Sequence, residues 1–136
     1  MSEEPRETII ARVIRSAMLG ITLLENYYIE LFEKLFNLSI ESVHVTGGTT
    51  RSKVWNKIRA AVYGKKVYVY GETIGPGIVV PFIVRNKIIT SIDEVKQKFI
   101  KPVEIVEPDP TWVEIYRRYK ESFTNKWLRL LDVYKA

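Results

Sequence analysis

The pattern of apolar positions along the chain begins with a long segment of helical period. Between residues 6 and 36, apolar side chains recur at alternating spacings of four and three, which places them on one helix face. These positions are Ile10, Ile14, Ala17, Ile21, Leu24, Tyr28, Leu31 and Leu35. We therefore expect one long helix with this stripe buried in a core. A coiled-coil partner is less favoured, because the polar positions do not form clean e and g pairs.

Shorter patterns follow this segment. Residues 43–46 predict a β-branched strand, residues 53–63 a helix that ends at Gly64, and residues 66–70 a second, alternating strand. The helix should turn these side chains toward the core: Val54, Trp55, Ile58, Ala61 and Val62. A strand, a helix and a strand at this spacing predict a βαβ unit whose two strands are parallel neighbours, joined right-handedly.

The last third of the chain predicts helices separated by a connector. Residues 90–99 favour a short helix, whereas residues 101–110 hold three prolines and three acidic residues and favour a surface connector. Residues 111–134 predict a final helix. Its expected inward positions are Trp112, Ile115, Tyr116, Tyr119, Phe123, Trp127, Leu130 and Leu131.

Composition narrows the class of protein. A chain of 136 residues with 46% apolar and 27% charged residues is typical of a single globular domain. Without cysteine, neither a disulfide framework nor a thiolate metal site is possible, and a reducing cytoplasm is the expected location. The only histidine, His44, falls within a predicted strand and is interpreted as structural. An acidic N-terminus and the lack of a long apolar run predict no secretion signal and no membrane span.

Positive charge is concentrated in one stretch. The whole chain has a net charge of +5. Residues 1–50 carry four basic and seven acidic side chains, whereas residues 51–66 carry six basic and no acidic ones. The six are Arg51, Lys53, Lys57, Arg59, Lys65 and Lys66. Such a stretch is compatible with nucleotide phosphates, with nucleic acid, or with a solvated helix face.

The basic stretch begins at a Gly-Gly turn between the first predicted strand and the next helix. The hydroxyl of either Thr50 or Ser52 can cap that helix. Unpaired N–H groups and a helix N-terminus around Gly47 and Gly48 would suit an anion such as a phosphate. The turn lacks the glycine spacing of the Walker motif, and the alternative interpretation is that the glycines only permit a positive φ.

Several segments resemble the C-terminal domain of the FGGY carbohydrate kinases, a family that includes the xylulose, glycerol and gluconate kinases. Residues 47–56 resemble its Gly-Gly-x-x-x-Ser-x-x-Trp-x-Gln segment, and residues 60–67 its Ala-Asp-x-x-Gly-x-Pro-Val segment. Residues 72–77 are similar to Glu-x-x-Ala-x-Gly, and residues 15–21 to the Arg-Ala-x-x-Glu-Gly-Ile helix. Residues 108–119 resemble the closing Pro-x-Pro and Tyr-x-x-x-Tyr segment.

The resemblance implies a fold. FGGY kinases have two actin-like, ribonuclease-H-like domains with the active site between them, and ATP lies mainly on the C-terminal one. Residues 1–136 are accordingly expected to be a single α/β domain that resembles the second half of that C-terminal domain. This partial actin-like ATPase domain would have a long helix, then the βαβ unit, then C-terminal helices, and would lack the first three strands.

The resemblance also implies a nucleotide site. Gly47, Gly48 and Thr49 would line the phosphate side of ATP, and Ser52 would lie by the adenine. Gly77 would belong to a helix that packs close to the nucleotide loop, although propensity alone favours a buried strand within residues 74–84.

Three positions depart from the family pattern. Lys57 replaces its glutamine, Ala61 its aspartate and Leu19 a glutamate. A lysine near the nucleotide can help to bind phosphate. No carboxylate is placed as a general base, and no acidic pair suits Mg²⁺, so Mg²⁺ would need a complementary domain.

The expected function is that of an ATP-binding fragment or subunit of a split or truncated FGGY-type sugar kinase, inactive alone. The alternative is a non-catalytic α/β scaffold or interaction domain descended from such a kinase. Nucleic-acid binding is disfavoured, because core packing explains the aromatic residues of the last helix. Two strands leave an open edge, which we expect to be covered by a chain carrying the missing kinase half, by a second copy of this chain or by a shifted helix. The first two are the expected partners besides the nucleotide. No membrane partner is expected.

Overall fold

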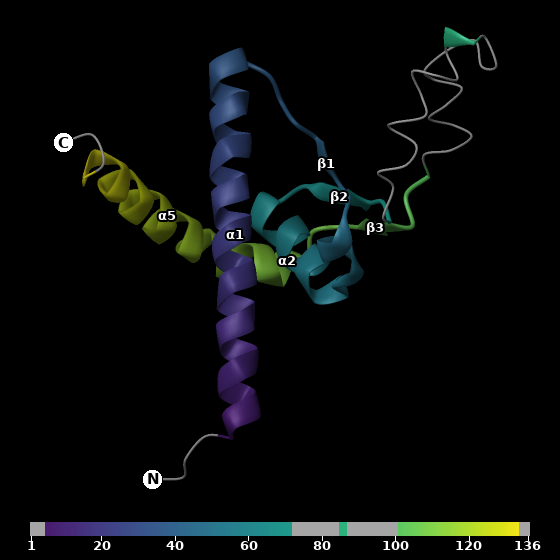
Figure 1. The fold of residues 1–136 in the computed structure, drawn as a ribbon. Helices are drawn as coiled ribbons and strands as arrows, with labels where there is room; N and C mark the ends of the chain where they lie inside the picture. Colours follow the sequence, from purple (N-terminus) through teal and green to yellow (C-terminus); the bar gives the residue numbers. More distant parts are fainter. Residues whose placement is uncertain (1–4, 72–84, 87–100, 134–136) are drawn as a thin grey trace.

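The structure is a computed structural model that describes residues 5–71, 85–86 and 101–133. Its elements in chain order are α1 (Arg6–Phe36), β1 (Ser42–Val45), the 3₁₀ helix η1 (Gly48–Arg51), α2 (Lys53–Tyr63), β2 (Lys66–Val69), β3 (Glu104–Val106) and α5 (Pro110–Val133). The long first helix, the strand–helix–strand unit and the final helix are present as predicted (Figure 1). The helices and strand considered for residues 74–84 and 90–99, and Gly77 with them, lie outside the described residues.

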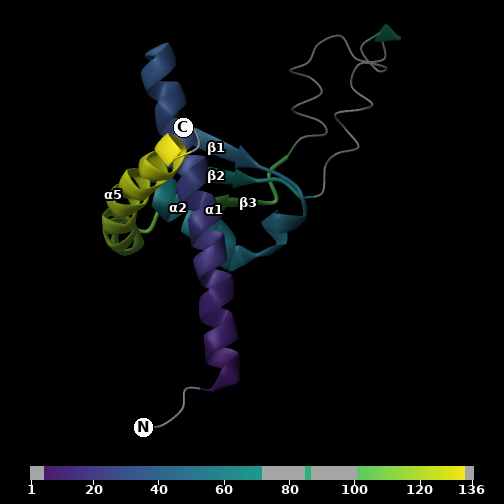
Figure 2. The ribbon, with the colours of Figure 1, turned by 60° about the vertical axis from the view of Figure 1, so that its left-hand side comes forward.

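The sheet has three strands in the order β1-β2-β3 (Figure 2). β1 pairs with β2 in parallel, with Val43 opposite Val67, which confirms the parallel βαβ unit. β3 pairs with β2 in the antiparallel direction, with Val106 opposite Val67. The prediction of a connector at residues 101–110 is therefore wrong. Among the described strands, β1 and β3 each have a neighbour on one side only.

Helix α2 is at the centre of the packing. It contacts α1, α5 and the sheet, and Figures 1 and 2 show it between the sheet and the two long helices. Its Ile58 and Val62 are fully buried together with Val67 and Val69 of β2, and Tyr116 of α5 closes the same cluster. This core is small, so each of its large side chains carries a considerable share of the stability.

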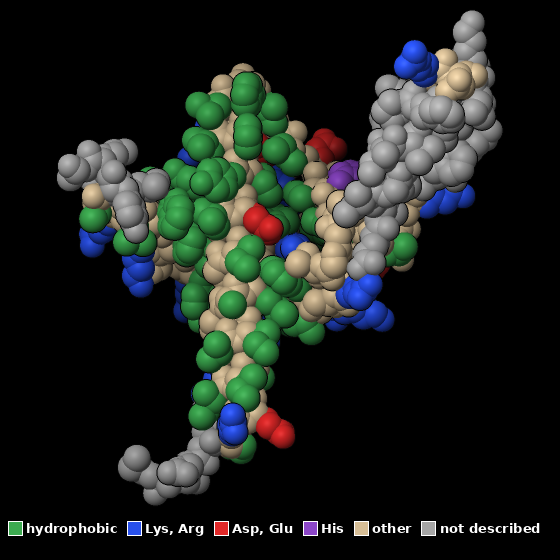
Figure 3. All heavy atoms as spheres, viewed as in Figure 1, with side chains coloured by type: hydrophobic (Ala, Val, Ile, Leu, Met, Phe, Trp, Pro, Cys, Tyr) green, Lys and Arg blue, Asp and Glu red, His purple; other side chains and the backbone are tan. Residues whose placement is uncertain are grey.

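The predicted stripe of α1 is not the side that packs in this structure. Thr22, Leu23 and Asn26 are the buried residues of the helix, and they face α2 and α5. Five side chains of the predicted stripe are instead between 46% and 68% exposed: Ile10, Ile14, Ile21, Tyr28 and Leu35. At about 100° per residue the two sets point to opposite sides of the helix. Helix α1 therefore has two apolar sides, one packed and one open, and apolar side chains follow its length in Figure 3.

Part of the expected packing of α2 and α5 also differs. In α2, Val54 is exposed, while Ile58, Ala61 and Val62 are buried as predicted. In α5, Tyr116 is buried, and Trp112, Phe123 and Trp127 are half-buried. The exposed members of the predicted inward set are Ile115, Tyr119 and Leu130. The Leu131 side chain lies outside the described part.

A carboxylate fixes the connection between α1 and β1. Glu33 accepts hydrogen bonds from the backbone N–H of Ile40 at 2.8 Å and from Lys65 Nζ at 2.9 Å. The Ile40 bond first, and then the Lys65 bond, hold the pKa of Glu33 below its usual value of 4.5. Because the folded-state pKa is depressed, this contribution to stability is complete above the unfolded pKa and is lost as the pH falls through the folded one.

We expect Glu33→Gln to lower the melting temperature relative to the wild type at about pH 7. The difference in melting temperature between the two proteins should be smaller at about pH 3. Thermal unfolding across this range, with the exposed Glu41→Gln as the control, measures the effect. A melting-temperature difference that does not change with pH would contradict the assignment.

Candidate functional site

The turn between β1 and α2 is built around Gly47. Its φ of +95° lies in the region that side chains with a Cβ rarely adopt, so the backbone itself requires glycine here. The N–H of Thr50 donates to the Gly47 carbonyl at 3.1 Å, and the Thr50 hydroxyl donates to the same oxygen at 2.6 Å. Gly48 has no positive φ, so its lack of a side chain is not demanded by the backbone.

The two glycines leave open space beside the main chain. A Cβ built on Gly47 or on Gly48 would have no atom within 4 Å, and the Gly48 and Thr49 residues are exposed. The first N–H groups of η1 begin here, and the first N–H groups of a helix have no partner within it. A nearby hollow of about 270 Å³ is lined by Thr50, Arg51, Gly71 and Val103. Gly77 lies outside the described residues, so its expected contact with the turn stays a prediction.

Ser52 forms the N-cap of α2. Its Oγ accepts a hydrogen bond from the N–H of Trp55 at 3.3 Å, whereas the Thr50 hydroxyl is directed to Gly47 instead. Of the two capping candidates, Ser52 is therefore the one used. A hydroxyl that accepts this bond keeps its own proton for a second acceptor.

We expect Ser52→Ala to cost about 1 kcal/mol of folding free energy, and Ser52→Gly only a few tenths, because glycine is itself tolerated at an N-cap. Urea unfolding of the two variants measures this difference. Equal losses in both variants would show that the serine acts through something other than the cap.

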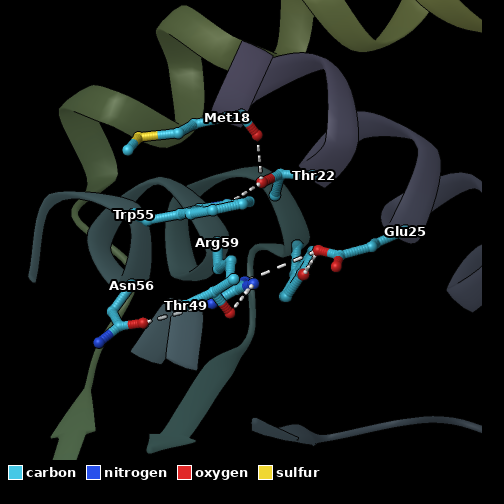
Figure 4. A network of polar contacts seen from close by, with 8 residues as sticks. Met18, Thr22, Glu25, Thr49, Trp55, Asn56 and Arg59 are labelled. Carbon is cyan, nitrogen blue, oxygen red and sulfur yellow. Dashed lines mark hydrogen bonds and ion pairs between the residues drawn. The ribbon is translucent and has the colours of Figure 1, made fainter. Parts of the chain in front are cut away.

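A buried arginine of α2 contacts the turn on the side that faces the core (Figure 4). Arg59 is 5% exposed and donates to the Thr49 hydroxyl at 3.1 Å and to Asn56 Oδ1 at 3.5 Å. Its guanidinium lies 4.6 Å from the centre of the Trp55 ring, and its Nε is 3.7 Å from a carboxylate oxygen of Glu25 on α1. Asparagine and arginine together hold the side of the turn that faces the core.

Further hydrogen bonds tie this network to α1 and to the end of α2. Asn56 Nδ2 donates to the Thr50 carbonyl at 2.9 Å. The Trp55 indole N–H donates to the Thr22 hydroxyl at 3.0 Å, and Thr22 donates in turn to the Met18 carbonyl at 2.7 Å. The Tyr63 hydroxyl donates to Glu25, and burial, followed by this bond, raises the pKa of Tyr63. The turn, α1 and α2 are thus joined by one chain of polar contacts.

This network changes the picture of the basic stretch. Arg59 is inside the protein, Lys65 is half-buried against Glu33, and Lys66 pairs with Glu107 at 2.7 Å. The exposed cations of residues 51–66 are Arg51, Lys53 and Lys57. The sequence counts Arg59 with the other basic residues of this stretch, and its burial could not be found from the sequence, because its partner Glu25 lies in another helix.

The described residues hold no group of three or more histidine, cysteine, aspartate or glutamate side chains that could bind a metal ion. Within the same residues, no helix is both long enough and apolar enough to cross a membrane.

Comparison with known proteins gives the family. Residues 1–77 match the sequence model described as the FGGY family of carbohydrate kinases, C-terminal domain. The chain belongs to the FGGY family. This match contains the Gly-Gly turn, the whole βαβ unit and the long helix before it, which confirms the resemblance seen in the sequence. No curated protein sequence matches this FGGY chain.

A solved structure extends the likeness beyond the matched residues. The FGGY chain superposes on the xylulose kinase from Rhodospirillum rubrum with a TM-score of 0.75 and 20% sequence identity. The superposition covers 90% of this chain but 25% of the kinase chain. The fold is therefore that of a fragment of an actin-like ATPase, as predicted. At this identity the likeness establishes the fold alone.

Proposed function

We propose that this FGGY protein binds ATP at the turn of residues 47–52 and provides the nucleotide side of a sugar kinase. The observation that carries the proposal is the open main chain at Gly48, where a side chain would meet no atom within 4 Å although the backbone does not require glycine. Glycine at such a position permits close approach of a ligand to the backbone. Gly47, Gly48 and Thr49 would lie along the phosphates and Ser52 toward the adenine, with Gly77 assigned by the family resemblance alone.

Charge around the turn supports the same ligand. Arg51 lines the hollow beside the turn, and Lys53 and Lys57 are exposed on the adjoining α2. Kinases act mainly by positioning groups and by neutralising charge on the transferred phosphoryl group. Mg²⁺ would be held by the ATP phosphates together with carboxylates of a complementary part, since the described residues have no acidic cluster of their own.

The sugar side and the catalytic base would come from a complementary polypeptide. Three observations support this partner: β1 has an unpaired side among the described strands, α1 has an exposed apolar side, and three-quarters of the similar kinase chain is not covered. Unpaired strand edges and large apolar patches are usually covered in stable proteins. A second copy of this chain, and a scaffold role without catalysis, are the competing outcomes.

Isothermal calorimetry with ATP tests nucleotide binding. Gly48→Val should fold normally, since its backbone and surroundings accept a side chain, but should abolish ATP binding by blocking approach to the main chain. Gly20→Val, where a Cβ also meets no atom within 4 Å, is the matched control on α1. Binding of an oligonucleotide that survives Gly48→Val would favour a basic-patch role instead. Wild-type protein that binds no ATP would overturn the proposal.

Size-exclusion chromatography with light scattering tests the need for a partner. Without its complementary polypeptide, the isolated chain should associate non-specifically through the exposed apolar side of α1, and Ile14→Lys combined with Ile21→Lys should reduce that association. Ser16→Lys, exposed on α1 outside the apolar stripe, should have no such effect. A well-folded monomer of the wild-type chain would contradict the requirement for a partner.

A further inference from the structure

A groove between α1 and α5, separate from the Gly-Gly turn, collects two arginines and three aromatic rings. It has a volume of about 340 Å³, within the range of small-molecule sites. Its lining residues are Arg12, Arg15, Ser16, Leu19, Trp112, Ile115, Tyr116 and Tyr119. The two positive side chains of this lining are Arg12 and Arg15, and the lining contains no carboxylate. It also joins two segments that the sequence analysis singled out, residues 15–21 and 108–119.

The guanidinium of Arg15 is held in a defined place. Its Nη2 donates to the Tyr116 hydroxyl at 3.0 Å, and its Cζ lies 5.2 Å from the centre of the Trp112 ring. The Trp112 ring and the Tyr116 hydroxyl together fix the plane of the guanidinium. Arginine has five N–H donors, and the Tyr116 bond uses one of them. A planar, oriented guanidinium of this kind suits two-point recognition of a carboxylate or a phosphate.

The rings provide the second part of the groove. Trp112, Tyr116 and Tyr119 follow one side of α5 at spacings of four and three. Tyr116 packs against Trp112 edge to face at 6.1 Å and against Tyr119 at 6.3 Å. Tyr116 is buried and serves as the base, while the Tyr119 ring is exposed. An exposed tyrosine on a rigid aromatic base offers a face to a planar ligand.

A carboxylate of α5 close to the groove has a cationic partner of its own. Glu114 lies in an adjoining hollow with Arg118 and Tyr119, and it is bound by Arg117 through two contacts at 2.9 and 3.1 Å. The hydrogen bond from Arg117 lowers the pKa of Glu114. Glu114 is thus paired with Arg117, and the side chains that line the groove include two arginines and no carboxylate.

We propose that this groove binds a small anion carried on a planar ring, with the anionic group at Arg12 and Arg15 and the ring against Tyr119 and the edge of Trp112. The site does not depend on ATP binding at the Gly-Gly turn. A phosphate and a carboxylate share the required chemistry, so the experiment separates them.

Nuclear magnetic resonance of the ¹⁵N-labelled full chain, titrated with phenyl phosphate, provides the test. The chain has three tryptophans, and we expect the indole N–H signal of Trp112 to shift saturably while those of Trp55 and Trp127 stay in place. Inorganic phosphate should bind at least about tenfold more weakly, because it lacks the ring. Benzoate in place of phenyl phosphate decides whether the anionic group is read as a carboxylate as well.

Arg15→Gln should weaken phenyl phosphate binding by at least about tenfold, whereas Arg117→Gln, an exposed arginine outside the groove, should leave it unchanged. Tyr119→Ala keeps both groove arginines and should remove the preference for phenyl phosphate over inorganic phosphate. Gly48→Val should have no effect, which separates this site from the nucleotide turn. A Trp112 signal that does not move, or equal losses in Arg15→Gln and Arg117→Gln, would overturn the proposal.

Discussion

Replacing Ile58 by alanine should lower the free energy of unfolding by about 2–5 kcal/mol, the usual range for removing a large aliphatic side chain from a core. Ile58 has no exposed surface and belongs to the cluster that joins α2 to β2 and to Tyr116 of α5. Because α2 contacts every large element of the fold, a cavity at this position has no free neighbour that can move in to fill it.

Urea unfolding of Ile58→Ala beside Val54→Ala measures this effect. Both residues are in α2, but Val54 is 51% exposed and should change stability by no more than about 0.5 kcal/mol. Similar losses in both variants would mean that α2 does not pack on the sheet through the Ile58 side.

Replacing Asn56 by leucine should also lower the free energy of unfolding. Asn56 is fully buried, donates to the Thr50 carbonyl and accepts from Arg59. Leucine has a similar size but leaves a buried carbonyl and part of a buried guanidinium without a partner. Unsatisfied buried groups of this kind cost about 1–3 kcal/mol each, and more when charged. The loss should also loosen the turn, because both contacts support Thr49 and Thr50.

Two measurements separate these consequences. Urea unfolding gives the loss of stability, with Lys57→Leu, the exposed neighbour on α2, as the matched control. Amide hydrogen exchange at residues 48–52 reports on the turn and should accelerate in Asn56→Leu but not in Lys57→Leu. Unchanged exchange in Asn56→Leu would show that the turn is held by its own backbone bonds alone.

The order and bounds of the elements were largely accessible from the sequence. Helix α1 has a long 3.6-residue period, and Ser52 and Gly64 mark the two ends of α2 with a cap at each. Strand β3 was missed because three residues, Glu104–Val106, are too few to show an alternation, and the prolines on either side indicate a loop.

Packing was less accessible. The apolar period of α1 identifies a face, but α1 has apolar residues on two sides, and only the neighbours decide which side is buried. The open Gly-Gly turn follows from its local sequence, whereas the support beneath it does not. Trp55 lies one helical turn before Arg59 on α2, but Glu25 and Thr49 belong to other elements, and no spacing along the chain brings them to Arg59.

The antiparallel pairing of β3 has a consequence for assembly. Because β3 pairs with the second side of β2, β2 is the central strand, and β1 and β3 are the two edges of the described sheet. A strand from another polypeptide that joined at β1 would lie beside residues 42–45, next to the position where the Gly-Gly turn begins. Such a strand would become an immediate neighbour of the proposed ATP site.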